Sequence, residues 1–269
     1  MKKLDLKVTG VTFSILLASL MISWFFSSYF FEILTMDYQA PDLINSDKRE
    51  IQKSFIIRIL TWETLVDASM FYLINFLPLI VVLPTLNLFN VKRVNYQIGK
   101  NRYLNLSKEI KKKVLYYSFL SAGTASLAFS VFYSIGGLFV YRSIENIGGY
   151  SFLYPNNFYI NHPYLFFISM VWTIYFAAFF VLSFITCGLV LYYQKVYQVL
   201  GILFLICFGV SSLSNIIGLP IINIYSAFTS YNTQLKTYES FVSVVLFGII
   251  GQVLFFIGKT KVQCFYEAN

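Results

Sequence analysis

The chain has 269 residues, of which 58% are hydrophobic and only 12% are charged. An ordinary soluble domain carries about 25% charged residues, so this composition excludes a soluble globular protein and indicates a chain embedded in lipid. The 29 phenylalanines and 21 tyrosines fit the same environment, because aromatic rings accumulate where hydrocarbon meets lipid headgroups.

Six apolar runs are long enough to cross a bilayer, which takes about 20 residues of helix. The first run is too long for a cleaved signal peptide, so we expect it to remain as an anchor. We therefore predict an all-α polytopic membrane protein, with a single transmembrane domain over residues 1–269. The predicted spans are residues 10–31, 68–90, 114–141, 164–193, 199–222 and 241–258.

The net charge of +8 is explained by its placement along the chain. With cytoplasmic N- and C-termini, the inner segments hold fourteen basic and three acidic residues, and the outer segments hold six basic and nine acidic residues. This distribution obeys the positive-inside rule, so the basic excess requires no nucleic-acid partner. We expect a multi-pass protein of the plasma membrane, in contact with lipid.

The first outer loop, residues 32–67, contains a predicted helix. Asp47 and Glu50 have N-cap spacing ahead of an amphipathic run. The apolar positions of that run are Ile51, Phe55, Ile59, Trp62 and Val66. The pattern favours a helix lying along the outer interface over an extension of the second span.

The most informative polar segment is residues 91–113, a basic stretch between the second and third spans. Its charges suit anionic lipid, and its apolar residues could also dock on another protein. The order of spans and motifs resembles the ABC-2 type permease subunits of Gram-positive bacteria. The motifs that carry the resemblance are Pro41, Phe76-Leu77-Pro78-Leu79, Pro84, Gly99, Arg102-Tyr103-Leu104, Ser107-Lys108, Pro155, His162-Pro163-Tyr164 and Pro220.

This resemblance implies an exporter subunit that pairs with a second permease chain and with separate ATP-binding-cassette ATPase subunits. ATP and magnesium would bind in the ATPase, and this chain would hold no cofactor of its own. This sequence departs from the family pattern in one respect, because Lys92-Arg93 stands where the family often has an acidic residue. By resemblance, the residues that couple the chain to the ATPase are Arg102, Tyr103, Leu104, Ser107 and Lys108.

No motif predicts a catalytic, cofactor-binding or metal site in the chain itself. Gly258-Lys259-Thr260 imitates the end of a phosphate-binding loop, but Val253 stands where the first glycine is required. The three cysteines, Cys187, Cys207 and Cys264, lie in or beside apolar runs and suggest no disulfide framework. His162 is the only histidine and is expected at the membrane interface. The chain is therefore not expected to be an enzyme.

The remaining polar and small residues have structural interpretations. Glu63 and Asp67 share one helical face, where a solvated surface is favoured over an acid–base pair. Small residues at 121–126 and 248–251 predict close packing of the third and sixth spans against neighbours. Within the spans, the residues expected to form interhelical hydrogen bonds are Asn75, Thr124, Asn215 and Gln252.

Two alternatives to the exporter subunit stay open. The first is a non-transporting membrane protein, such as an immunity or accessory factor that protects against an antimicrobial peptide (bacteriocin immunity). In that case the 32–67 loop would matter more than the 91–113 segment. The second is an intramembrane enzyme, which lacks a candidate nucleophile–base or metal constellation in the sequence.

Overall fold

A computed structural model describes residues 2–37, 47–90, 106–140, 149–155, 157–229, 236 and 238–267. Over these residues the fold is all-helical and has no β-strand. The longer helices are α1 (Lys2–Ser27), α3 (Lys48–Ile59), α4 (Trp62–Phe71), α7 (Leu106–Gly136), α9 (Pro163–Met170), α10 (Phe176–Tyr192), α11 (Val196–Ile217) and α12 (Glu239–Glu267). The shorter elements are α2 (Phe30–Thr35), α5 (Leu77–Val81), α8 (Phe158–Asn161) and the 3₁₀ turns η1 (Leu83–Leu86), η4 (Gly149–Leu153), η6 (Pro220–Ile222) and η7 (Ile224–Ala227).

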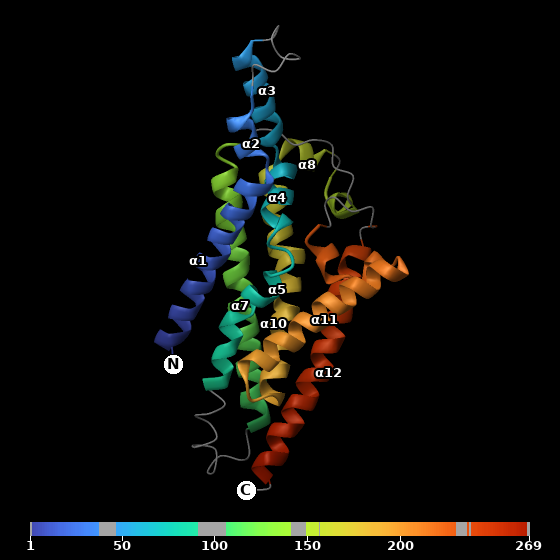
Figure 1. Cartoon of the computed structure of the whole chain (residues 1–269). Helices are drawn as coiled ribbons and strands as arrows, with labels where there is room; N and C mark the ends of the chain where they lie inside the picture. Colours follow the sequence, from blue (N-terminus) through green and yellow to red (C-terminus); the bar gives the residue numbers. More distant parts are fainter. Residues whose placement is uncertain are drawn as a thin grey trace.

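The long helices form an elongated bundle with both chain termini at the same end (Figure 1). We call this the terminal end, and the opposite end, which carries α2, α3 and α8, the distal end. Among the described residues, five helices are long and apolar enough to span a membrane, and they overlap five of the six predicted spans. They are Leu4–Ser27, Ser107–Gly136, Pro163–Tyr192, Val196–Ile217 and Phe241–Gln263.

The predicted second span, residues 68–90, is not one continuous helix. It comprises the end of α4, a turn over residues 72–76, α5, η1 and one helical turn at residues 87–90. Pro78 and Pro84 each lie in the first turn of a new helical piece, where a missing N–H costs little, whereas a proline inside a helix would break it. These pieces pack against α1, α7, α10 and α11, so the segment runs through the bundle in broken form.

The predicted helix of the first outer loop begins where expected but ends early. The carboxylate of Asp47 caps α3 by accepting a hydrogen bond from the Arg49 backbone N–H at 2.9 Å. The helix stops at Ile59, and Thr61 caps a new helix, α4, so Trp62 and Val66 belong to a different element. Figure 1 shows α3 projecting from the distal end along the length of the bundle, which differs from the predicted helix lying along the interface.

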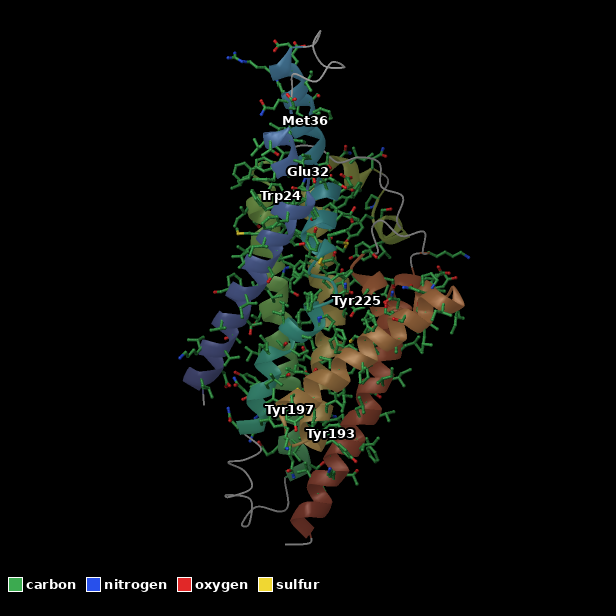
Figure 2. The ribbon with its side chains drawn as sticks, viewed as in Figure 1. Trp24, Glu32, Met36, Tyr193, Tyr197 and Tyr225 are labelled. Atoms are coloured by element: carbon green, nitrogen blue, oxygen red, sulfur yellow. The ribbon has the colours of Figure 1, made fainter. Side chains whose placement is uncertain are left out.

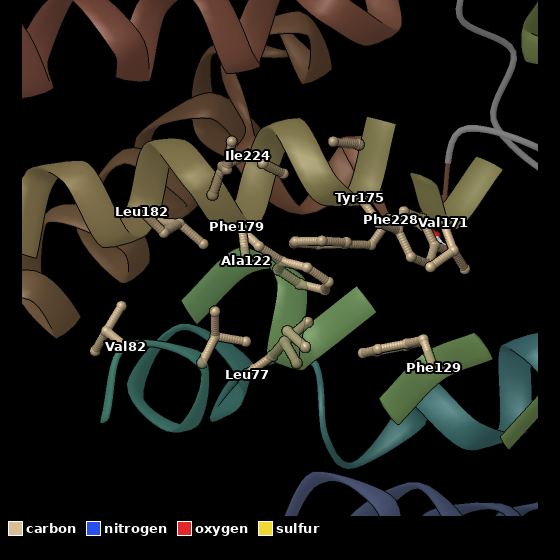
Figure 3. Close-up of a cluster of buried hydrophobic side chains, with 14 of the residues drawn as sticks. Leu77, Val82, Ala122, Phe129, Val171, Tyr175, Phe179, Leu182, Ile224 and Phe228 are labelled. Carbon is tan, nitrogen blue, oxygen red and sulfur yellow. Dashed lines mark hydrogen bonds between the residues drawn. The ribbon is translucent and has the colours of Figure 1, made fainter. Parts of the chain in front are cut away.

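The core of the bundle is centred on α9 and α10, which follow one another in a continuous helical stretch, Pro163–Tyr192. This stretch packs against α7 and α12. Aromatic side chains fill its distal half: Phe129 from α7 lies 5.6 Å from the Tyr175 ring and 5.5 Å from the Phe179 ring, centroid to centroid. Phe228 stacks on Phe179 at 5.3 Å (Figure 3). Ala122 and Ala125 are fully buried in the same helix α7, so the small residues at 121–126 do allow the close packing that the sequence predicted.

Glycines bring α10 and α12 into backbone contact. A Cβ added at Gly258 would lie 2.6 Å from the Gly188 carbonyl oxygen, and one at Gly188 would lie 2.9 Å from the Phe255 nitrogen. Gly251 is also close, at 3.0 Å from Phe184, whereas Gly248 has an ordinary distance of 3.9 Å. The predicted small-residue contact of the last span is therefore real, and its closest point is Gly258, which the sequence offered only as an imitation of a phosphate loop.

Helix α11 diverges from the bundle, and the chain then returns to it (Figure 1). Gly218 ends α11 with φ +73°, a left-handed conformation that glycine adopts without strain. The following 3₁₀ turns bring Ile224, Ala227 and Phe228 into fully buried positions. The Tyr175 hydroxyl holds this return segment by donating a hydrogen bond to the Phe228 carbonyl at 2.6 Å.

Candidate functional site

Two of the five residues predicted to couple the chain to an ATPase lie in the described part of the chain, at the start of α7. Arg102, Tyr103 and Leu104 lie outside the described residues. Ser107 and Lys108 lie in the first turn of α7 at the terminal end, where Ser107 is half-buried and Lys108 is exposed. The structure thus places two of the five on one helical turn and does not test the role of any of them.

The first two turns of α7 separate apolar from basic side chains. Ile110 and Val114, one helical turn apart, are buried against the bundle. Lys108, Lys111 and Lys112 lie on the exposed side of the helix. The burial of the apolar pair orients the helix, and the lysines consequently project away from the bundle core.

Basic residues of two other elements extend this surface. Lys195 lies between α10 and α11, with its ammonium 5.6 Å from the centroid of the Tyr197 ring. Lys261 of α12 lies over the Tyr192 ring at 3.8 Å, a cation–π distance that links α12 to the end of α10. Figure 2 shows Tyr197 and Tyr193 near the same end of the molecule. We define the basic end by Lys108, Lys111, Lys112, Lys195, Lys259 and Lys261.

A buried carboxylate lies close to the basic end. Asp5 of α1 is only 5% exposed, and its Oδ1 accepts hydrogen bonds from Asn87 Nδ2 and from the Tyr117 hydroxyl, both at 3.1 Å. Ionisable side chains inside membrane spans are costly and are commonly functional. This node joins α1, the last turn before the 91–113 segment, and α7.

The Asp5 node is not predicted by the sequence analysis, because Asp5 precedes the first predicted span and is one of the three acidic residues of the inner segments. A signal was present in the sequence. Asp5 has helical spacing with other residues that the structure buries on the same helix, namely Thr12, Leu16, Leu20 and Ser23.

Serines rather than amides connect the helices at mid-bundle. Ser183 of α10 donates to Ser121 of α7 at 2.8 Å, and Ser121 in turn donates to the Val81 carbonyl. The residues predicted to form interhelical hydrogen bonds do not connect the helices here. The Thr124 hydroxyl donates within its own helix to the Leu120 carbonyl at 2.7 Å, and the side chains of the three others are exposed. These three are Asn75, Asn215 and Gln252. Short hydroxyl side chains suit this seam because they permit the close approach that longer amides would prevent.

The distal end carries an aromatic and hydroxyl network. Glu63 accepts a hydrogen bond from the Tyr159 hydroxyl, so it belongs to this network rather than to the solvated face predicted for it. Tyr154 and Ser169 pair at 2.5 Å, and Tyr150 pairs with Thr173. Burial raises the pKa of the Tyr150 hydroxyl above its ordinary value, so the group stays a neutral hydrogen-bonding partner.

Thr173 lies in a π-helical turn, Val171–Tyr175, inserted between α9 and α10. Such turns free backbone carbonyls, and the Thr173 hydroxyl donates to the Ser169 carbonyl at 2.8 Å. His162, by contrast, is exposed beside Phe158 at the start of α9. Run length and capping patterns do not predict the π-helical turn, which contains the Thr173 hydroxyl that pairs with Tyr150.

Among the described residues, no group of three or more His, Cys, Asp or Glu side chains could hold a metal ion. Cys187 and Cys207 are buried free thiols. The chain matches no family model, no curated protein and no solved structure. The geometry itself therefore defines the class: a membrane-embedded helical bundle with a basic surface at one end and a buried carboxylate beneath it.

Proposed function

We propose that the chain is a permease subunit of an ATP-driven exporter and that its basic end docks on a separate ATPase. The observation that carries this proposal is the position of α7. Its first turn bears Ser107 and Lys108, two of the five proposed coupling residues, and the whole helix extends over 31 residues from Leu106 to Gly136 at the distal half of the bundle. One rigid element thus connects the proposed docking surface to the far end of the molecule.

Contacts along α7 support a role as a lever. Near the basic end, Tyr117 bonds to Asp5 and links α7 to α1. At mid-bundle, Ser121 bonds both to the broken segment and to α10. At its distal end, Gly136 packs against the Leu65 side chain of α4. A displacement of the first turn of α7 would therefore move several helices together, as alternating access requires.

In this proposal both termini and the 91–113 segment are cytoplasmic, the broken 68–90 segment makes a sixth crossing, and the membrane is the plasma membrane of a Gram-positive bacterium. The charge asymmetry of the sequence supports this orientation. A second permease chain would complete the translocation path. The lightly buried spans α1 and α11, with 22% and 17% of their most apolar stretches buried, offer the apolar faces for that partner and for lipid.

The experiment is a mild-detergent purification of the tagged chain, with mass spectrometry of the proteins that co-purify. We expect an ATPase with nucleotide-binding motifs to be recovered with the wild type and lost when Tyr103 and Leu104 are both changed to Asp. The matched control changes Tyr29 and Leu34 to Asp, because these are an exposed tyrosine and an exposed leucine at the distal end. Recovery of no ATPase from cells that express the chain at its natural level would overturn the proposal.

A non-transporting immunity or accessory protein is the second candidate, favoured by the projection of α3 from the distal end (Figure 1). It predicts that removal of residues 38–58 abolishes protection against an antimicrobial peptide. It also predicts that the Tyr103→Asp, Leu104→Asp variant protects as well as the wild type. An exporter subunit that removes the same antimicrobial peptide predicts loss of resistance in the double variant, so one survival assay separates the two functions.

A further inference from the structure

A cavity of about 630 Å³ lies between the distal parts of α1 and α7. This volume falls within the roughly 300–1,000 Å³ of small-molecule pockets. It is closed on the distal side by Phe30 of α2 and by Leu60, which follows α3. Helix α1 contributes Ile22, Trp24 and Phe26 to the lining, and α7 contributes Phe132 and Ile135.

The lining carries no charged side chain, so a charged or peptidic ligand would lose its hydration without compensation. The rim residues Ile22 and Phe26 of α1 and Ile135 of α7 are 58%, 66% and 37% exposed, so the cavity opens on the surface of two membrane spans. The apolar molecule present at that surface in the greatest amount is membrane lipid.

A second cavity, of about 460 Å³, lies between α1 and the broken 68–90 segment and shares Ile22 and Phe26 with the first. It is the weaker candidate for a hydrocarbon ligand because Ser19, Ser23 and Tyr72 contribute polar groups to its lining. The Ser23 hydroxyl is already used, since it donates to the Ala68 carbonyl at 2.8 Å and holds α1 to α4.

The position of the cavity along α1 indicates where the headgroup of a bound lipid would lie. Trp24 lies three residues before the end of α1, which corresponds to about 5 Å along the helix axis. Figure 2 shows Glu32 and then Met36 beyond Trp24 toward the distal end. A chain in the cavity would therefore place its headgroup near the exposed carboxylate of Glu32, which attracts an ammonium group and repels an anionic headgroup.

We propose that this cavity binds an acyl chain of a zwitterionic, amine-bearing phospholipid and that the bound lipid fills the seam between α1 and α7. The occupied site stabilises the distal half of α1, where the Ser23 and Ser27 hydroxyls donate to the Ala68 carbonyl and the Tyr72 N–H donates to the Ser23 hydroxyl. This inference is independent of any ATPase partner.

The test is native mass spectrometry of the full chain, released from nanodiscs of mixed phosphatidylethanolamine and phosphatidylglycerol. We expect one phosphatidylethanolamine to remain bound. Ile135→Trp, which fills the cavity from a residue 37% exposed at its edge, should lower the retained fraction about tenfold. Ile216→Trp on α11 is the matched control, because Ile216 is exposed and does not line the cavity, and it should retain lipid like the wild type.

A second measurement does not depend on Ile135→Trp folding. A variant with Trp62→Phe and Trp172→Phe leaves Trp24 as the single tryptophan, which is excited selectively at wavelengths where tyrosine does not absorb. Acyl-brominated phosphatidylethanolamine should quench it at a lower lipid fraction than it quenches a variant that retains only Trp172. Equal quenching of the Trp24-only and Trp172-only variants would overturn the proposal. So would equal lipid retention by Ile135→Trp and Ile216→Trp, or a retained molecule other than phosphatidylethanolamine.

Discussion

Helices α10 and α11 follow one another in the chain, and both are apolar enough to span a membrane, yet they occupy opposite environments. In the span that contains α10, 72% of the most apolar stretch is buried inside the bundle, compared with 17% for α11. Each helix contains glycine. Gly188 of α10 touches the α12 backbone, whereas Gly201 and Gly209 of α11 have no atom of another element within 4 Å of an added Cβ.

The difference teaches that hydropathy identifies a membrane helix but does not say what covers it. In lipid, an apolar face gains little by leaving hydrocarbon, so close backbone packing and hydrogen bonds decide which helices become central. Helix α10 has both, through Gly188 and through Ser183, whose hydroxyl bonds to Ser121. The larger exposed side chains of α11, such as Leu205 and Ile216, are left to face lipid or a partner.

The largest effect is expected where α12 meets α10. Gly258→Val places a branched side chain against the Gly188 carbonyl oxygen and the Leu191 Cβ, so the helices must separate. We expect a loss of about 3 kcal/mol or more of stability, at the upper end of overpacking effects. The readout is the fraction of monodisperse protein that survives heating in detergent, measured by size-exclusion chromatography with fluorescence detection.

Gly201→Val is the matched control for that substitution, because the same side chain enters open space on α11. It should change the thermal midpoint little, as substitutions away from packed features usually stay within about 0.5 kcal/mol. Equal losses in the two variants would show that α11 packs as closely as α10 and would break the comparison.

An intermediate effect is expected at Asp5, which fixes α1, the other helix near the edge of the bundle. Asp5→Ala leaves the buried donors of Asn87 and Tyr117 without their shared acceptor, at a cost of about 1–3 kcal/mol. Asp5→Asn keeps an acceptor oxygen and should lose less than half of that amount. Thermal unfolding of the three proteins checks this order, and an alanine variant as stable as the asparagine variant would rule out a structural role for the node.

The contrast between predicted and observed elements follows from the range of the interactions that decide them. The long apolar helices and the Asp47 cap could be predicted, because run length and capping depend on residues close in sequence. Pro78 and Pro84 mark the break of the 68–90 segment, whereas the length of the apolar run alone predicts a continuous span. The helical spacing of Asp5 with the buried face of α1 is visible in the sequence, but its partners Asn87 and Tyr117 are not, because they come from distant segments. The distal cavity could not be predicted for the same reason, since α1, α2, α4 and α7 all contribute to its lining.

The smallest effect is expected at the return segment after α11, and it asks which helix holds that segment. Tyr175→Phe removes the hydroxyl that donates to the buried Phe228 carbonyl and should cost about 1 kcal/mol. It should also speed amide hydrogen exchange over residues 224–228 without changing exchange in α11. Tyr197→Phe is the control, because the Tyr197 side chain is exposed at the start of α11 and its ring stays available to Lys195. Faster exchange in both α11 and the return segment would show that the two unfold as one unit. The hydrogen bond from Tyr175 to Phe228 would then stabilise the position of α11 as well.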